Sequence, residues 1–242
     1  TIAADACVYG GTAAGVVAAA ILAEQGVDVV LLHPGRNLGG MTTGGLGWTD
    51  YGRAEVIGGR SREFYRAVGA IYGEPEVLKF PPSAAQRVID EWVERAGFNV
   101  VRCAYLDRAE VDGAHIVSAH MVGGMTVRAR VWIDATYEGD LMAAAGVPFT
   151  VGREGNAVYG EQANGVQVRH LHQFDPAGVD PFVEPGRPAS GLLRHVESCN
   201  LLEHVGRGDH KVQAYCFRVC MTDDPELNID WPRPDGYDPL AY

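Results

Sequence analysis

Two glycines separate an apolar run from an alanine-rich segment near the N-terminus, in the stretch ACVYGGTAAGVVAAAILAEQG at residues 6–26. Residues 6–9 are typical of a buried strand, and residues 13–25 are typical of a helix that ends at Gly26. Residues 27–32 are rich in β-branched side chains, which indicates a second strand covered on both faces. The three segments predict a βαβ unit, with the glycine turn between its first strand and its helix.

The glycine turn reads G-G-T-A-A-G and matches two of the three glycines of the dinucleotide-binding pattern G-x-G-x-x-G. Gly10 permits a tight turn and Gly15 permits close packing of helix on strand, while Thr12 stands at the position of the middle glycine. Free N–H groups at a helix N-terminus, with their partial positive charge, attract phosphate oxygens. The turn therefore predicts a nucleotide site, and the alternative is a glycine turn with a purely structural role.

The second strand ends in His33, at the position where a carboxylate commonly accepts hydrogen bonds from ribose hydroxyl groups. A neutral histidine can accept one such bond, but it carries no negative charge. We therefore expect His33 to discriminate weakly at the ribose. The alternative is an ordinary histidine at a strand end.

Composition argues against several classes of function. The 242 residues carry a net charge of −11, whereas nucleic-acid-binding and anionic-membrane surfaces both need basic patches. The longest apolar run, around residues 13–23, is shorter than the roughly 18 residues that a membrane-spanning helix needs. The five cysteines are an odd number and form no C-x-x-C pair, so we expect reduced thiols. Taken together, these features predict a soluble protein, with the cytoplasm favoured.

The remainder of the chain divides into a patterned and a weakly patterned part. Helical spacing of apolar residues predicts helices at 60–72 and 83–96, the second with a capping-box pattern at its start. Alternation on both sides of the Gly-Gly pair at 123–124 predicts a β-hairpin. Beyond residue 146, glycine, proline, asparagine and aspartate are frequent and periodicity is poor, which places a domain boundary there.

Several further segments resemble the FAD-dependent oxidoreductase family whose nucleotide domain is of the glutathione-reductase type. They are LLHPGRNLGGMTTGGLG, SAAQRVIDEWVERAG, IDATYEGDLMAAAG, VGREGNAVYGE, HQF and QAYCFRVCMTDDP. Together with the glycine turn they extend over nearly the whole chain, so their combined pattern is much more specific than the turn alone. Some members of this family carry the label xanthan lyase, but nothing in the sequence suggests a polysaccharide-cleaving site.

The resemblance implies an α/β fold. Residues 1–146 would form a Rossmann-like FAD/NAD(P)-binding domain with a β-hairpin or meander insertion. Residues 147–242 would begin a mixed α+β substrate domain, which we expect to be truncated because the proline-rich end stops without a closing element. The family also holds the ribityl chain and the pyrimidine end of the flavin with a final segment not found here. We therefore expect a missing C-terminal segment or a second chain to complete the flavin site.

The resemblance also implies which residues bind FAD. The glycine-rich loop after the second strand would fold over the diphosphate, and the end of the last strand would meet it from the other side. Tyr137 stands where the family more often has glycine, and we expect its ring to crowd the dinucleotide. The implied cofactor-binding residues are Gly10, Gly11, Thr12, Ala13, Ala14, Gly15, His33, Pro34, Arg36, Gly39, Gly40, Met41, Thr42, Leu106, Ala135, Thr136, Gly139 and Asp140.

Three residues are candidates for catalysis. Asp50 lies in the glycine-rich loop, and His172 forms an H-x-H pair with His170. That pair lacks a third ligand at a recognisable spacing, so we expect no metal site and two surface histidines instead. Arg218 beside a flavin would stabilise a reduced flavin anion or a carboxylate substrate, and the alternative role is a structural ion pair.

These observations predict a FAD-dependent oxidoreductase that transfers hydride between flavin and an unidentified small organic substrate. One alternative is an NAD(P)-dependent dehydrogenase with the same turn. Another is a non-catalytic nucleotide-binding subunit or remnant, which Thr12, His33 and Tyr137 favour as departures from the family pattern. We expect neither a nucleic-acid nor a membrane partner.

Overall fold

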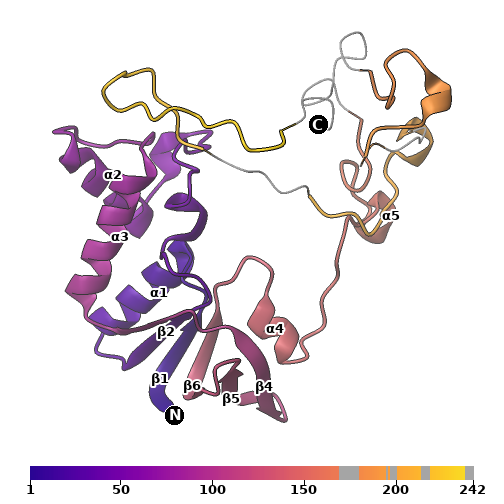
Figure 1. Cartoon of the computed structure of the whole chain (residues 1–242). Coiled ribbons are helices and arrows are strands. Elements are labelled where there is room, and N and C mark those ends of the chain that lie inside the picture. Colours follow the sequence, from indigo (N-terminus) through magenta and orange to yellow (C-terminus); the bar gives the residue numbers. More distant parts are fainter. Residues whose placement is uncertain (169–179, 195, 197–200, 214–218, 238–242) are drawn as a thin grey trace. The chain divides into compact units, whose positions relative to one another are not determined.

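The computed structural model describes residues 1–168, 180–194, 196, 201–213 and 219–237. Its strands are β1 (Ile2–Tyr9), β2 (Val29–His33), β3 (Asn99–Arg102), β4 (Leu106–Asp112), β5 (His115–Met121) and β6 (Thr126–Asp134). They form one six-stranded sheet with the order β3-β2-β1-β6-β5-β4 (Figure 1). Strands β1, β2, β3 and β6 pair in parallel, while β5 pairs antiparallel with both β6 and β4.

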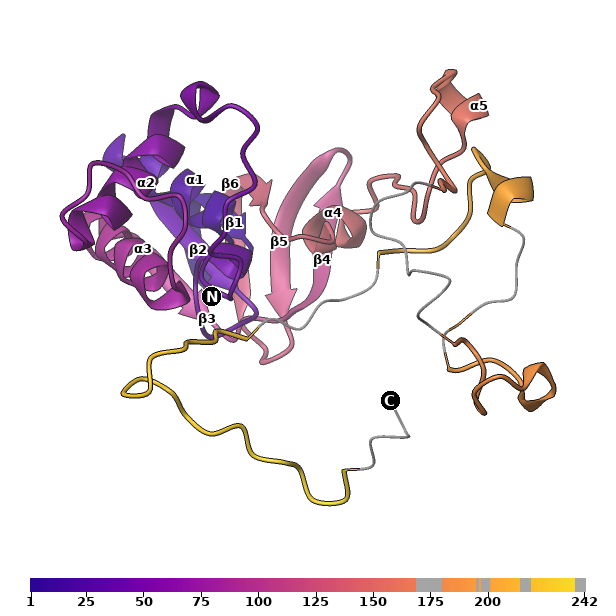
Figure 2. The same ribbon diagram turned by 90° about the horizontal axis from the view of Figure 1, so that it is seen from above.

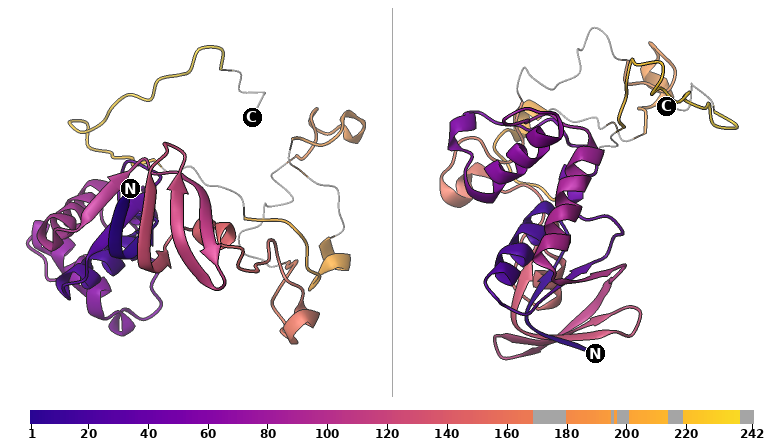
Figure 3. Two further views of the ribbon diagram at one scale, coloured as in Figure 1. Left: turned by 90° about the horizontal axis from the view of Figure 1, so that it is seen from below. Right: turned by 90° about the vertical axis from the view of Figure 1, so that its left-hand side faces the viewer.

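Helices cover the part of the sheet that contains β1 and β2. Figure 2 shows α1 (Ala13–Glu24), α2 (Gly59–Ile71) and α3 (Pro82–Ala96) gathered there. In Figure 3 the hairpin of β4 and β5 lies at the opposite end of the sheet from these helices. The shorter elements are α4 (Asp140–Ala144), α5 (Asn156–Tyr159) and the 3-10 turns η1 (Gly40–Thr42), η2 (Ala54–Val56), η3 (Pro188–Ser190) and η4 (Leu201–His204).

The central strands β1 and β2 are buried on both faces. Alternate residues of each strand enter two separate apolar clusters, one against α1 and α3 and one on the side of the β4–β6 strands and α4. The first contains Ala6, Val8, Val29 and Leu31, and the second contains Cys7, Tyr9, Val30 and Leu32. Burial also raises the pKa of the Cys7 thiol to about 12. The expected βαβ unit with strands covered on both faces is confirmed.

The structure corrects the predicted start of the helix at residues 83–96. The observed helix α3 begins at Pro82, directly after Pro81, and no side chain caps its N-terminus. Proline suits the first turn of a helix because its fixed φ is already helical and its missing N–H would have no partner there. The rigid prolines thus set this boundary instead of the predicted capping box.

The chain divides into two compact units. The first comprises Thr1–Pro148 and Phe217–Tyr242, and the second comprises Phe149–Cys216. The roles assigned to residues 1–146 and 147–242 stay predictions. Within the described residues, none of the helices combines the length and the apolar character required to traverse a lipid bilayer.

The second unit is held by close backbone approach instead of long elements. Arg153 and Asp209 exchange two backbone hydrogen bonds of 2.8 and 2.9 Å, and their side chains form an ion pair. That ion pair lowers the pKa of Asp209 to about 2. A Cβ on Gly155 would lie 2.9 Å from the Gly208 nitrogen, so the two segments pack without room for a side chain between them.

Replacement of Leu31 by alanine tests the core beneath the β1–β2 pair. Leu31 is fully buried, so its truncation leaves a cavity that should lower the free energy of unfolding by about 2–5 kcal/mol. Urea denaturation followed by circular dichroism measures this loss. Val122→Ala is the control, because Val122 is 72% exposed and its truncation should change the value by less than about 0.5 kcal/mol. Equal effects of the two variants would contradict the core assignment.

Candidate functional site

The predicted glycine turn lies between β1 and α1, at the carboxyl end of a central parallel strand, where ligands bind in open α/β sheets. Gly10 has a φ of +109°, and a Cβ there would lie 2.6 Å from the backbone of Ala135 and Thr136. A Cβ on Gly15 would overlap the carbonyl oxygen of Gly10. Both positions therefore require glycine, Gly10 because of its positive φ and the backbone that follows β6, and Gly15 because α1 packs directly on the turn.

Thr12 closes the turn with its side chain. Its buried hydroxyl group accepts a hydrogen bond from the Gly15 N–H at 3.2 Å and donates one to the Ala135 carbonyl at 2.8 Å. It is thus the N-cap of α1 and also a link to the segment after β6. This dual role gives a physical reason for threonine at the position of the middle glycine.

The first turn of α1 retains two free donors. Within the described residues, the Ala13 and Ala14 N–H groups donate no hydrogen bond, and both residues are at least partly exposed. The first turn of α1 carries no acidic side chain that would neutralise its positive end. This donor set fits a diphosphate, which needs unpaired N–H groups and partial positive charge.

The loop after β2 packs against the turn, as the resemblance implies. The Gly39 N–H donates to the Gly11 carbonyl at 2.8 Å, and Gly39 and Gly40 have φ values of +96° and +57°. A Cβ on Gly40 would overlap the hydroxyl group of Tyr137. These glycines let three segments meet: the glycine turn, this loop and the segment after β6.

Tyr137 reaches across to the glycine loop. Its hydroxyl oxygen accepts a hydrogen bond of 2.7 Å from the Met41 N–H. Met41 is one of the implied cofactor-binding residues, and its N–H group is occupied by Tyr137 in this arrangement. The ring itself is about half exposed, and its crowding of a dinucleotide stays a prediction.

The segment after β6 forms a wall of the site through its own hydrogen bonds. Asp134 Oδ1 accepts from the N–H and the hydroxyl group of Thr136, at 2.9 and 2.7 Å. The Thr136 hydroxyl oxygen accepts from the N–H groups of Gly139 and Asp140, at 2.9 and 3.0 Å. Because Ala135 in this segment is bound to Thr12, the wall lies directly against the turn. Cofactor contacts by these residues stay predictions.

His33 performs a different task from the one expected. Its Nδ1 atom accepts a hydrogen bond from the Gly11 N–H at 3.0 Å, which assigns the proton to Nε2, and Nε2 donates to the Asn37 carbonyl at 2.9 Å. Both ring nitrogens are therefore used inside the protein. The acceptor role toward a ribose hydroxyl group is not available in this arrangement, and the ring instead joins the glycine turn to the loop after β2.

Burial lowers the pKa of His33 below its ordinary value of 6.5, and the positive charge of Arg102 lowers it further. The hydrogen bond to the Asn37 carbonyl acts in the opposite direction. Protonation of Nδ1 would also place two N–H groups, those of His33 and Gly11, against each other. The neutral imidazole is therefore the form that the site requires.

Two contacts near the implied cofactor-binding residues Pro34 and Leu106 are not predicted by the sequence. The Leu106 N–H donates to the Tyr9 hydroxyl oxygen at 3.0 Å, so the backbone donor of Leu106 is satisfied by β1. Cys103 adopts a φ of +56°, and its N–H donates to the Gly35 carbonyl at 3.1 Å. A strand-end pattern alone carries no signal for either contact. The predicted proximity of Pro34 and Leu106 to a cofactor stays a prediction.

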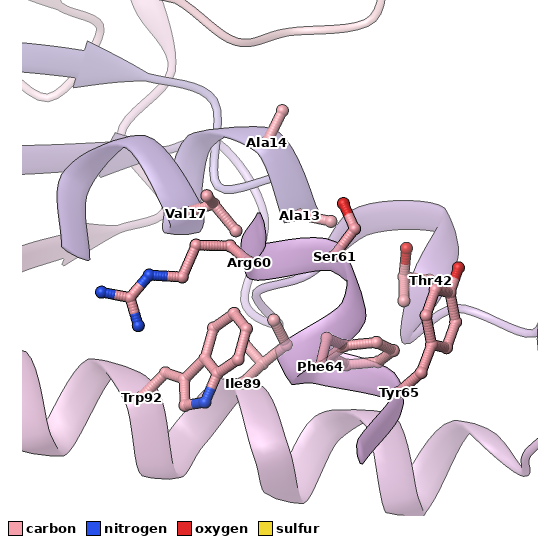
Figure 4. A pocket seen from close by; sticks show the side chains of 10 residues that line it. All are labelled: Ala13, Ala14, Val17, Thr42, Arg60, Ser61, Phe64, Tyr65, Ile89 and Trp92. Carbon is pink, nitrogen blue, oxygen red and sulfur yellow. The ribbon is translucent and has the colours of Figure 1, made fainter. Parts of the chain in front are cut away.

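A cavity of about 320 Å³ adjoins the free donors of α1 (Figure 4). Ala13 and Thr42 line one part of it, and Ile89 and Trp92 of α3 line another. A second cavity of about 440 Å³ shares Ser61 and Tyr65 with the first and is also lined by the candidate residue Asp50. The start of α1 is therefore open to a ligand.

The other catalytic candidates, His172 and Arg218, lie outside the described residues. Among the residues that the structure does describe, no group of three or more histidine, cysteine or acidic side chains is arranged to hold a metal ion. Asp50 is thus the one catalytic candidate that can be placed within the described part of the chain.

The hydrogen bonds of His33 predict a stability that depends on pH. Since the folded pKa lies below 6.5, the unfolded chain binds the proton more readily just below that pH. The contribution of neutral His33 to the free energy of unfolding is therefore present above pH 6.5 and is lost as pH falls through the folded pKa. His33→Gln, which does not titrate, should show a shallower loss of stability in urea denaturation from about pH 8 to about pH 5.

His115→Gln is the matched control for this experiment, because His115 is exposed and makes none of the contacts of His33. Its stability should decline with pH as that of the unmodified chain does. A His33→Gln curve parallel to that of the unmodified chain would show that His33 is not the group whose protonation weakens the fold.

Comparison with known proteins assigns the chain to a family. The sequence model of the family described as FAD dependent oxidoreductase matches residues 5–242. No curated protein sequence matches the chain.

Similar solved structures include L-proline dehydrogenase from P. horikoshii, with 14% identity, a TM-score of 0.48, and coverage of 64% of this chain and 59% of that chain. A flavoprotein/dehydrogenase from Cytophaga hutchinsonii has 17% identity, a TM-score of 0.45, and coverage of 62% and 44%. An aromatic hydroxylase from angucycline biosynthesis has 20% identity, a TM-score of 0.45, and coverage of 63% and 35%. The matched part thus spans less than two thirds of each of these proteins.

The family match covers nearly the whole chain and confirms the resemblance drawn from its segments. The chain belongs to the family of FAD-dependent oxidoreductases.

Proposed function

We propose that this chain is the FAD-binding part of an enzyme that transfers hydride between FAD and a small organic substrate. The observation that carries the proposal is the open first turn of α1, where Ala13 and Ala14 line a cavity and their N–H groups have no partner among the described residues. Nearby backbone leaves no room for a side chain at Gly10 or Gly15, because of Ala135 and Thr136 in the first case and the Gly10 carbonyl in the second. FAD, the cofactor of the family, supplies the diphosphate that such a turn binds.

The residues of the site act on the cofactor by position and charge. The α1 N-terminus would bind the diphosphate, and Thr12 would hold the turn in its binding shape through its two hydrogen bonds. The loop at Gly39 and Gly40 would cover the diphosphate from the side of β2. When bound, FAD accepts or donates the hydride, and the protein supplies orientation, charge and exclusion of water.

We infer that Asp50 acts on a substrate. It lines the second cavity, which shares Ser61 and Tyr65 with the cavity at the α1 N-terminus. A carboxylate there would hold or accept a proton from a hydroxyl or amino group of a substrate. The position of Asp50 in this cavity supports a role at the substrate over that of an ordinary solvent-exposed side chain.

Residues beyond this chain, either a further C-terminal segment or a second chain, would complete the flavin site. The stretch at 219–237 supports this, because several of its large apolar side chains are exposed. Met221 is 87% exposed and Ile229 is 89% exposed. We propose a cytoplasmic location, since Cys7, Cys103 and Cys220 form no disulfide among the described residues and free thiols persist in reducing compartments.

A non-catalytic nucleotide-binding subunit is the second candidate function. It is favoured by two implied cofactor-binding residues, His33 and Met41, whose ring nitrogens and N–H group are occupied by other parts of the protein. The two functions differ in turnover. A catalytic chain reduces an artificial electron acceptor in the presence of substrate, whereas a binding subunit retains FAD without turnover.

Replacement of Gly15 by alanine tests the cofactor site. The new Cβ would overlap the Gly10 carbonyl, so the turn must open and the free donors of α1 must move. We expect FAD affinity to fall about tenfold or more, equivalent to about 1.4 kcal/mol or more. Flavin absorbance of the purified protein and titration of the FAD-free chain measure this change.

Gly123→Ala is the matched control, because a Cβ at Gly123 meets nothing within 4 Å and should leave FAD affinity unchanged. Circular dichroism of both variants checks that the sheet is retained. If folded Gly15→Ala protein binds FAD as the unmodified chain does, the turn is not the diphosphate site and the proposed function fails.

A further inference from the structure

The second strand does not end in the carboxylate that normally selects an unmodified ribose. A carboxylate at the end of the second strand accepts hydrogen bonds from ribose hydroxyl groups and repels a phosphate attached to them. Here the position is occupied by His33, which is neutral and uses both ring nitrogens for Gly11 and Asn37. No negative charge from this position therefore opposes a ribose phosphate.

Two guanidinium groups lie on the segments that flank this position. Arg102 is the register partner of His33 in the parallel pairing of β2 with β3. Arg36 follows His33 by three residues, in the loop that leads to Gly39. Both arginines are exposed.

Two backbone hydrogen bonds hold these segments side by side. The Cys103 N–H donates to the Gly35 carbonyl at 3.1 Å, and the Ala104 N–H donates to the His33 carbonyl at 2.9 Å. Arg36 directly follows Gly35, and Arg102 directly precedes Cys103. The backbone thus brings the two arginines to the same end of the site.

Neither of these arginines is neutralised by a carboxylate within the described part of the chain. Several arginines of the first unit do have a carboxylate partner, for example Arg62 with Glu76 at 3.1 Å and Arg130 with Asp5 at 2.7 Å. The chain as a whole has a net charge of −11, so two adjacent unpaired cations stand out from their surroundings. Unpaired guanidinium groups are the side chains best suited to phosphate.

We propose that Arg36 and Arg102 form a phosphate subsite at the ribose end, so that the site prefers adenine nucleotides whose ribose carries a 2′-phosphate. The proposal rests on the proposed function, because it assumes that the adenosine of a dinucleotide lies at the ends of β2 and β3. FAD lacks this phosphate, so a 2′-phosphorylated nucleotide competes with FAD for the FAD-free chain. An Arg beside the ribose position is the general means by which such folds accept a 2′-phosphate.

Matched ligand pairs measure the preference directly. Calorimetric titration of the FAD-free chain at about pH 8, where His33 is neutral, compares 2′-phospho-ADP-ribose with ADP-ribose. We expect the phosphorylated ligand to bind about tenfold more tightly, since two exposed guanidinium contacts each contribute a modest screened attraction. The preference should decrease as salt is added. Coenzyme A against its 3′-dephospho form tests the other source of a ribose phosphate.

Single and double variants test whether Arg36 and Arg102 cause the preference for the 2′-phosphorylated ligand. Arg36→Gln and Arg102→Gln should each reduce it to about threefold, and the double variant should abolish it. His33→Glu keeps an acceptor for the Gly11 N–H and adds a negative charge. It should therefore reverse the preference, so that ADP-ribose binds more tightly than its 2′-phosphorylated form. Arg95→Gln is the control, because Arg95 is exposed in the last turn of α3 and its loss should leave the preference unchanged.

Equal affinity for the two ADP-ribose ligands would overturn the proposal, as would a preference that survives in the double variant. A larger effect for the coenzyme A pair would overturn the assignment to the 2′ position. Titration of the same preparation with FAD distinguishes a failure of the phosphate subsite from a failure of the proposed function. FAD binding with no phosphate preference refutes the subsite alone, while absence of binding by FAD and by every adenine ligand refutes both.

Discussion

The nucleotide site depends on the two hydrogen bonds of the Thr12 hydroxyl group. One caps the first turn of α1 at Gly15, and the other fixes the turn to Ala135 after β6. A glycine at this position would leave both bonds unmade, although it would allow a ligand closer to the backbone. Because the threonine fills the cap itself, the two remaining donors of α1 are held in place before any ligand arrives. Binding then costs less conformational entropy, which is the advantage of a preorganised site.

The sequence predicted the parts of this structure that rest on local patterns. The βαβ unit follows from an apolar run, a glycine turn and an alanine-rich helix, all within residues 6–32. Its two strands are buried on both faces, as their continuous apolar character indicates. The requirement for glycine at Gly10 and Gly15 was also predictable, because the reason is a close approach of backbone. The start of α3 was not, since consecutive prolines produced a boundary that the capping pattern concealed.

The parts that escaped prediction depend on partners far apart in sequence. Tyr137 and Met41 are 96 residues apart, and Tyr9 and Leu106 are 97 residues apart. No periodicity or motif in the sequence indicates such pairs, so the sequence does not show that the N–H groups of Met41 and Leu106 are occupied. His33 differs, because its departure from a carboxylate is visible in the sequence. What the sequence does not show is that an imidazole has two nitrogens and that the fold offers a partner for each.

The two ends of the site are therefore constrained in different ways. At the diphosphate end, the limiting contacts join backbone to backbone, and a single Cβ at Gly10 or Gly15 disrupts them. At the ribose end, the limiting contact is a side-chain acceptor for the Gly11 N–H, which an imidazole nitrogen or a carboxylate oxygen satisfies equally well. Under the proposed phosphate subsite, a change of charge at position 33 would alter which ribose is accepted without altering the turn. Nucleotide choice would then be separable from the fold in this chain, because the selecting groups are side chains, whereas the binding turn is backbone.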